Sequence, residues 1–289
     1  MLFRSCSMIL LMACTASEPT SSQYIGSVTF LEDAEIRSFC GGRTELSIDG
    51  DLQIGQAITD LSGLFCLRDV SGYLHIEATA LQNLHGLEGL QHIGEYLYLG
   101  YNRDLEDLSG LGGLTEIDGS ADIKGHLRLQ NLSGLSLLRV GRSLDIRGNM
   151  GMTSLEGLES LKIVGMDLRI EYNDDLVDVS ALSALPVVGR DFFVMGSPDL
   201  VDLSGMQLER IGGDFSLSRS GLVDLEGMEE LRLVSGNFFV IDNPFLERLD
   251  AAHPEKIRKN VRILGNPRLE GVDAWLQGVE VGGTTEISP

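Results

Sequence analysis

The sequence predicts a mainly β fold, a parallel β-helix in which about ten coils of 23–24 residues stack into a single solenoid. The first observation is repetition, because the stretch 141–164, GRSLDIRGNMGMTSLEGLESLKIV, has near-copies at 94–117 and 165–188. The second is a change of period within each copy, from alternating apolar residues to apolar residues at every third position. The third is size. One copy hides about six aliphatic side chains, which cannot offset the entropy of ordering its backbone, so the copies must stack.

Each coil opens with a strand. In 141–164, Leu144 and Ile146 point to one side of the chain while Asp145 points to the other. The segment that follows does not fit a helix of 3.6 residues per turn and favours a chain that turns corners. Its apolar residues are Met152, Leu155, Leu158 and Leu161. Coil starts are expected near Gly50, Ser71, Gly94, Asp118, Gly141, Gly165, Gly189, Gly212, Ser235 and Lys259.

The open end of a solenoid needs a cap. Residues 33–39, DAEIRSF, have helix-compatible spacing at Ile36 and Phe39, so we expect them to form a helical cap over the first coil. The first strand pair is expected at 44–48 and 50–54.

The N-terminal residues have the layout of a secretory signal, with Arg4 ahead of a short apolar run. The sequence LMAC at 11–14 resembles a bacterial lipobox, which implies that Cys14 becomes an acylated membrane anchor. Thr15 after it resembles the outer-membrane sorting pattern of Gram-negative lipoproteins. An ordinary signal peptide with a chance cysteine is the alternative. The apolar run is too short to span a bilayer as a helix. We therefore expect a signal peptide at 1–13, a flexible tether at 14–32 and one solenoid domain at 33–289.

The cysteines and the net charge restrict the cellular compartment and the classes of partner. Cys40 and Cys66 form an even pair in an exported chain, where disulfides persist, so we predict that they are bonded. The formal charge is −21 with Lys at four positions, which argues against nucleic acid or an anionic membrane surface as a partner. Divalent-ion binding by this acidity is the less favoured alternative to simple solubility. No cofactor and no metal are expected, because the five histidines show no ligand spacing: His75, His85, His92, His126 and His253.

The stretch 71–94, SGYLHIEATALQNLHGLEGLQHIG, with the cysteine pair ahead of it, resembles the receptor L-domain family. The resemblance covers about residues 33–281 and rests on the repeats rather than on one motif. It implies a right-handed parallel β-helix, distantly related to leucine-rich repeats, and a role at the cell surface. It transfers no catalytic residue and no signalling function.

Aligned coils place equivalent residues in columns about 4.8 Å apart. One column is expected to serve the backbone of the next coil: Asn102, Asn149, Asn173, Asn243 and Asn266, with Thr79, His126, Ser197 and Ser220 in the same place. A second column is expected to mark a tight corner: Gly110, Gly134, Gly157, Gly205 and Gly227.

The outward positions of the strands divide into three zones. The aromatic zone contains Tyr73, His75, Tyr96 and Tyr98. The charged zone contains Asp122, Lys124, Asp145, Arg147, Arg169 and Glu171. The apolar zone contains Phe193, Met195, Phe239, Ile241 and Leu264. Strand parity places Phe192 and Phe238 inside, so Phe193 and Phe239 are expected outside, where exposed apolar surface marks an interaction site unless a segment such as that around Trp275 covers it.

The leading functional hypothesis is a non-catalytic, lipid-anchored module at the outer membrane or cell surface. It would recognise an unknown protein or glycan through the strand face, with the apolar zone, Tyr73, Tyr96 and Tyr98 as candidate contacts. A structural envelope protein is the second hypothesis. A carbohydrate-active enzyme that uses Asp122 and Asp145 is the third hypothesis. It comes last because a solvated ladder of opposite charges on neighbouring strands is the favoured interpretation of these residues.

Overall fold

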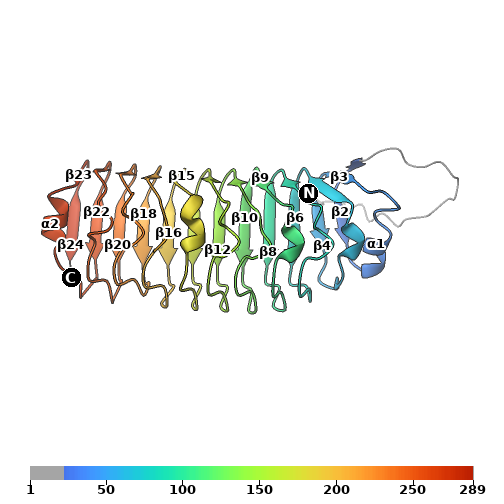
Figure 1. Cartoon of the computed structure of the whole chain (residues 1–289), viewed down its shortest axis with the longest axis horizontal. Helices are drawn as coiled ribbons and strands as arrows, with labels where there is room; N and C mark the ends of the chain where they lie inside the picture. The colour runs from blue at the N-terminus through green and yellow to red at the C-terminus, as the bar shows by residue number, and fades with distance from the viewer. Residues whose placement is uncertain (1–22, 289) are drawn as a thin grey trace, which may run out of the picture.

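The computed structural model describes residues 23–288, which form an elongated parallel β-solenoid (Figure 1). Each turn gives one strand to each of two parallel sheets, and both sheets contain 12 strands. Sheet A holds the odd-numbered strands β1 to β23, and sheet B holds the even-numbered strands β2 to β24. A third side of corners and short helices closes every turn.

The strands of sheet A are β1 (Gln23–Ile25), β3 (Leu46–Asp49), β5 (Leu67–Val70), β7 (His92–Ile93), β9 (Glu116–Ile117), β11 (Arg139–Val140), β13 (Ile163–Val164), β15 (Val187–Val188), β17 (Arg210–Ile211), β19 (Leu233–Val234), β21 (Lys256–Ile257) and β23 (Glu280–Val281). Those of sheet B are β2 (Val28–Phe30), β4 (Leu52–Ile54), β6 (Tyr73–Glu77), β8 (Tyr96–Gly100), β10 (Ser120–Lys124), β12 (Leu144–Arg147), β14 (Leu168–Glu171), β16 (Phe192–Met195), β18 (Phe215–Ser218), β20 (Phe238–Ile241), β22 (Val261–Leu264) and β24 (Thr285–Ser288). The third side carries α1 (Asp33–Arg37), η1 (Ser62–Leu64), η2 (Ser109–Leu111), η3 (Ser180–Ala184) and α2 (Val272–Leu276).

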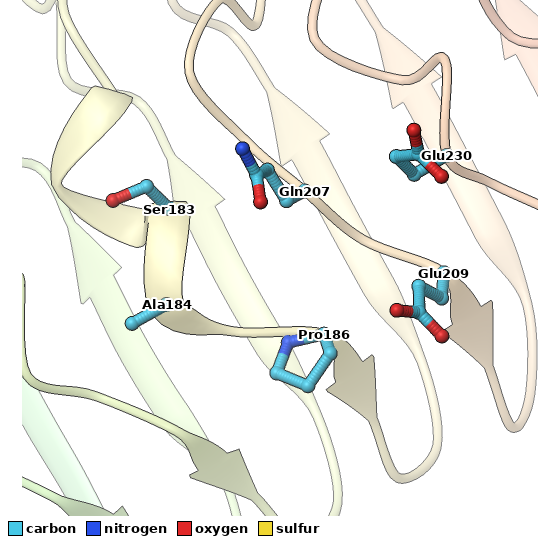
Figure 2. A pocket seen from close by; sticks show the side chains of 6 residues that line it. All are labelled: Ser183, Ala184, Pro186, Gln207, Glu209 and Glu230. Atoms are coloured by element: carbon cyan, nitrogen blue, oxygen red, sulfur yellow. The ribbon is translucent and has the colours of Figure 1, made fainter.

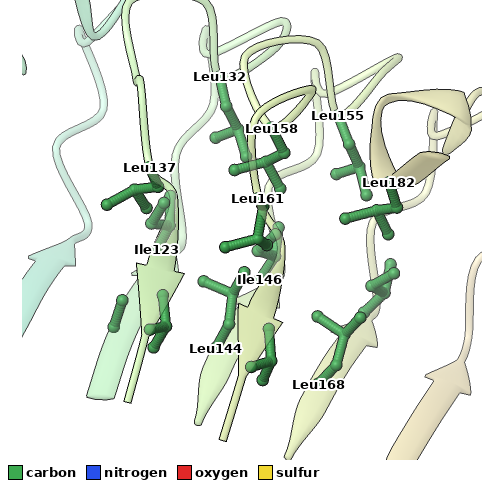
Figure 3. Packing of buried hydrophobic residues seen from close by; sticks show 14 of the residues in the cluster. Ile123, Leu132, Leu137, Leu144, Ile146, Leu155, Leu158, Leu161, Leu168 and Leu182 are labelled. Carbon is green, nitrogen blue, oxygen red and sulfur yellow. The ribbon is translucent and has the colours of Figure 1, made fainter. Parts of the chain in front are cut away.

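The core follows from the change of period in each repeat. On β12, Leu144 and Ile146 are fully buried and pair in register with Leu168 and Ile170 of β14. Leucines of the third side point back at these strands and complete each layer (Figure 3). The corner needs glycine where the chains of neighbouring turns touch. At Gly157, φ is +107° and an added Cβ would lie 2.0 Å from the carbonyl oxygen of Leu132.

The number of turns corrects the expectation of about ten, since twelve strand pairs are present. The two additional turns are the terminal ones, with β2 and β24 as their sheet B strands. Both strands of the first turn lie within 14–32, the segment expected to be a tether. They were missed because the short apolar stretch VTF is set among polar residues. The last turn was missed because its sheet B strand, TEIS, contains one apolar residue and lacks the alternation seen in the other strands.

The expected helix near Asp33 is present as α1, but it is not an outer cap. It forms the third side of the first turn, where Ile36 is fully buried and the ring of Phe39 packs 5.0 Å from that of Phe30. The disulfide between Cys40 and Cys66 is also present, with the two Cα atoms 5.8 Å apart, and it ties this turn to the next.

The expected polar column forms a buried ladder. The amide of Asn149, for example, donates to the carbonyl oxygen of Ile123, and its Oδ1 accepts the backbone N–H of His126. The residue with left-handed backbone is the one before the polar column. Tyr101 and Tyr172 adopt φ of +56° and +55° at this place, and their rings lie over the glycine of the next turn.

Candidate functional site

The outer face of sheet B is the candidate site, and it is built from three columns of side chains that run along the solenoid. The middle column contains Gln53, His75, Tyr98, Asp122, Asp145, Arg169, Phe193, Ser216, Phe239, Arg262 and Glu286, all joined in register. The strand register therefore places the outward residues of successive coils side by side, in the order that the repeats predict. The corners and helices lie on the third side of each turn, so they leave this face open.

In the aromatic zone, the rings are packed against one another and are only partly exposed. The ring of Tyr98 stacks on His75 with centroids 4.6 Å apart, and Lys124 Nζ lies 4.5 Å from the Tyr98 centroid. The Tyr98 hydroxyl donates to Glu77 at 3.2 Å. Both ring faces of Tyr98 are thus in use, so this candidate contact offers its edge rather than a free ring face.

The charged zone is joined to the aromatic zone. Burial raises the pKa of the Tyr96 phenol, and the neighbouring carboxylate of Asp122 acts in the same direction. Asp122 accepts from Lys124 at 3.3 Å. The aromatic and charged zones therefore form one connected network rather than two separate patches.

Asp145 is the most enclosed acid of this network. Its exposed fraction is 7%, its ion pair with Arg147 is 3.6 Å long, and its Oδ1 has no hydrogen-bond partner. Burial raises the pKa of the Asp145 carboxyl to about 6, with the carboxylates of Asp122 and Glu171 acting in the same direction and Arg147 opposing. A carboxyl with this pKa can gain or lose its proton near neutral pH, but the burial of Asp145 denies a substrate direct access to it.

The apolar zone has the parity expected from the sequence. Phe192 and Phe238 are fully buried, whereas Phe193 and Phe239 face outward and are half-buried. Trp275 does not cover them. It turns inward, packs 5.2 Å from the Phe238 ring and donates its indole N–H to Ala252.

Guanidinium groups cover part of each outward ring. Arg169 lies 5.2 Å from the ring centroid of Phe193, and Arg262 lies 6.0 Å from that of Phe239. The apolar zone is accordingly less bare than the sequence alone indicates, because long cationic side chains lie flat over neighbouring rings.

A second polar ladder, which sequence reasoning missed, runs along the edge of this face where the strands begin. Asp191 Oδ1 accepts the N–H of Asp214, whose Oδ1 accepts from both nitrogens of Asn237. Asn237 in turn accepts from Asn260. The signal was the recurrence of Asp or Asn one residue before the sheet B strands β14 to β22, as in GMD, GRD, GGD, SGN and RKN.

A linear arrangement of Ser109, His85 and Glu88 on the third side was also missed. The Oγ of Ser109 is 3.4 Å from His85 Nε2, and His85 Nδ1 is 3.0 Å from Glu88. The Ser109 hydroxyl also donates to Asp107 at 2.5 Å, within a turn that most coils repeat, and the histidine is well exposed. Because Asp107 competes with His85 for the Ser109 hydroxyl, we interpret this arrangement as part of a corner rather than as a nucleophile activated by its base.

A shallow notch of about 420 Å³ opens on the third side (Figure 2). Its lining consists of Ser183, Ala184, Pro186, Gln207, Glu209 and Glu230. The cause is local, because η3 is long and the next corner is one residue shorter than its predecessor. Figure 2 shows its polar side chains spread along separate turns, without convergence on one point.

Within residues 23–288, no three His, Cys, Asp or Glu side chains converge in a way that could hold a metal ion. In the same range no helix has the length and apolar character needed to cross a membrane. Cys14, the expected lipid site, lies outside the described residues. No protein-family model matches the sequence, and no curated protein or solved structure is significantly similar to it.

Proposed function

We propose that this protein is a lipid-anchored recognition module at the outer membrane or cell surface, of the receptor L-domain type and without chemistry of its own. The observation that carries the proposal is the outer face of sheet B, which extends across twelve strands and combines an ionic network with half-buried apolar side chains. A broad surface of this composition suits a protein or glycan partner better than a small substrate, which needs a concave pocket.

The anchor and the disulfide fit together in this proposal. Export would place the Cys40–Cys66 bond in an oxidising compartment, where it persists. Acylation of Cys14 would leave only a short linker before β1, so the solenoid would stand close to the membrane. Replacement of Cys14 by Ser should release the protein from the membrane fraction, and unchanged partition of that variant would contradict the anchor.

Recognition is tested by retention on the surface of the source cells, with the full chain carrying Cys14→Ser so that lipid does not contribute. The double variant Phe193→Ser/Phe239→Ser should weaken retention by at least about tenfold, which corresponds to about 1.4 kcal/mol. The matched control is Val177→Ser/Val201→Ser, which removes two exposed apolar residues from the third side. Equal retention by both double variants would contradict the proposal.

A further inference from the structure

The apolar zone is interrupted by a gap one strand wide, and we propose that this gap is a binding slot for one aromatic side chain that a partner polypeptide carries next to a basic residue. The inference rests on the proposed recognition function and names the partner class for it. Ser216 on β18 lies in register between Phe193 on β16 and Phe239 on β20. The two phenyl side chains are the walls of the slot, and the serine hydroxymethyl is its floor.

The next outward column repeats this arrangement. Ser218 lies between Met195 and Ile241, again in register on the same three strands. The slot therefore continues along the strand direction for at least two side-chain positions, with apolar walls on both sides and small polar residues below. Its depth comes from the difference in length between serine and the flanking side chains.

The inner side of the same strands gives the width of the slot. There the buried rings of Phe192, Phe215 and Phe238 form a continuous stack, with successive centroids 5.8 and 4.6 Å apart. The backbone spacing of β16, β18 and β20 thus accepts one ring between two others. On the outer side the walls belong to strands about 9.6 Å apart, two spacings of about 4.8 Å, so the middle ring is the missing member. A ring from another chain can occupy that place and stack on both walls.

The arginines leave the slot side of each wall free. Arg169 is on β14 and lies over Phe193 from the side away from Ser216, and Arg262 on β22 lies over Phe239 from the opposite end. Across the slot, no ring contact or cation–π pair joins the two phenyl groups in the part of the chain that the structure describes. The outward residues of the successive strands β14, β16, β18, β20 and β22 are therefore Arg, Phe, Ser, Phe and Arg, an order that is symmetric about Ser216.

Charge distinguishes the two ends of the slot. Asp191 and Asp214 stand at the end where the strands begin, on the same face as the walls. Asp191 is already paired with Arg190 at 3.5 Å. Asp214 Oδ1 accepts from Asn237, but the Asp214 carboxylate forms no ion pair with any residue in 23–288. A basic residue beside the bound ring would supply the missing countercharge, and the net charge of −21 favours the approach of a cationic segment.

The walls favour an aromatic side chain over a sugar ring. All four wall residues present hydrocarbon or thioether surface, whereas the several hydroxyls of a sugar need hydrogen-bond partners. The floor offers only the two serine hydroxyls, and the nearest carboxylate is already bound to Asn237 through one oxygen.

The test uses the full chain with Cys14→Ser, labelled at methionine and isoleucine methyl groups, and the dipeptide N-acetyl-Lys-Tyr-amide as the probe. Ring entry should shift the methyl resonances of Met195 and Ile241 upfield in a saturable way. N-acetyl-Glu-Tyr-amide should bind about fivefold more weakly because its charge is reversed. N-acetyl-Lys-Leu-amide should produce no ring-current shift.

Ser216→Phe fills the slot with its missing ring and should abolish the shifts without lowering the melting temperature. Phe193→Ser removes one wall and should also abolish them, which keeps the test decisive if the larger side chain disturbs folding. Gln53→Phe adds a ring to the same column elsewhere and should leave the shifts unchanged.

Three results would overturn the slot. They are a folded protein that gives no saturable shift with the Lys-Tyr probe, shifts that persist in Ser216→Phe, and saturable shifts with methyl glucoside in place of the dipeptide. The recognition function itself is judged separately by cell-surface retention. Loss of retention in Phe193→Ser/Phe239→Ser with no dipeptide binding would reject the slot while sparing the function.

Discussion

The inner and outer sides of β16, β18 and β20 differ although they alternate along the same three strands. Inside, Phe192, Phe215 and Phe238 form an unbroken stack with no exposed surface. Outside, one residue later, the corresponding row is Phe193, Ser216 and Phe239, which are half-buried and interrupted. The difference shows that the repeat specifies the inner side by packing, whereas the outer side is free to vary and can therefore carry recognition.

The polar ladders show the same contrast. The ladder through Asn149 and Asn173 is fully buried and satisfies backbone groups that water cannot reach. The ladder through Asp214 and Asn237 is half-buried at the edge of the outer face and could exchange its bonds with water. The first is a condition for folding, and the second positions the edge of a surface.

The largest expected effect compares the two sides directly. Phe215→Ala should lower the free energy of unfolding by about 3–5 kcal/mol, because it leaves a cavity in the inner stack. Ser216→Ala, the neighbouring residue on the outer side, should change it by less than about 0.5 kcal/mol. Urea unfolding of the two variants measures the difference, and similar losses for both would mean that the strand parity is wrong.

The second expected effect is the pH dependence caused by Asp145. Its pKa in the folded protein is about 6, above the ordinary value of 3.8, so the folded state holds this proton more tightly than the unfolded chain. The contribution of this group to the free energy of unfolding is present at pH values below 3.8 and is lost as the pH rises through about 6.

Asp145→Asn removes this titration. Relative to the wild type, the variant should gain stability between about pH 4 and pH 7, reaching about 2–3 kcal/mol at the upper end. Thermal or urea unfolding of both proteins across this range provides the measurement. Parallel stability profiles for the two proteins would show that the carboxyl is not enclosed as described.

The third comparison concerns the two ladders. Asn149→Ala strips buried backbone groups of their partner and should cost about 1–3 kcal/mol. Asn237→Ala breaks equivalent bonds at the edge of the outer face, where water can replace them, and should cost less than about 1 kcal/mol. Urea unfolding at neutral pH distinguishes the two values, and an equal cost would remove the contrast between the ladders.

The smallest expected effect is at the guanidinium groups. Arg169→Gln should cost about 0.5–1 kcal/mol through loss of the cation–π contact with Phe193, in addition to the loss of its 3.1 Å ion pair with the buried Asp167. Arg262→Gln should cost less, because its contact with Phe239 is longer and its ion pair with Glu286 is exposed. Urea unfolding measures both losses, and a larger loss for Arg262→Gln would contradict the contacts described for the two arginines.

The sequence predicted most of the solenoid because each inner position is repeated in turn after turn. Leu144 and Ile146 established the strand parity, and that parity correctly placed Phe193 and Phe239 outside. The terminal turns were missed because β2 and β24 lack the leucine pattern of a complete coil.

The outer face was less predictable, since its contacts join residues that are adjacent only after stacking. Arg169 covers Phe193, and Tyr98 is enclosed between His75 and Lys124. Both contacts depend on side-chain conformations, which aligned repeat sequences do not specify. The network around Asp145 likewise required knowledge of burial, because a charged column reads equally as a solvated ladder.

Site-specific photo-crosslinking on the source cells tests most directly whether the outer face of sheet B is the recognition surface. The photoreactive residue p-benzoylphenylalanine would replace Leu264 on that face, Val201 on the third side or Val187 on the outside of sheet A, each in the Cys14→Ser protein. We expect a discrete adduct from position 264 and none from positions 187 and 201. Adducts from Val187 or Val201 with none from Leu264 would contradict the account.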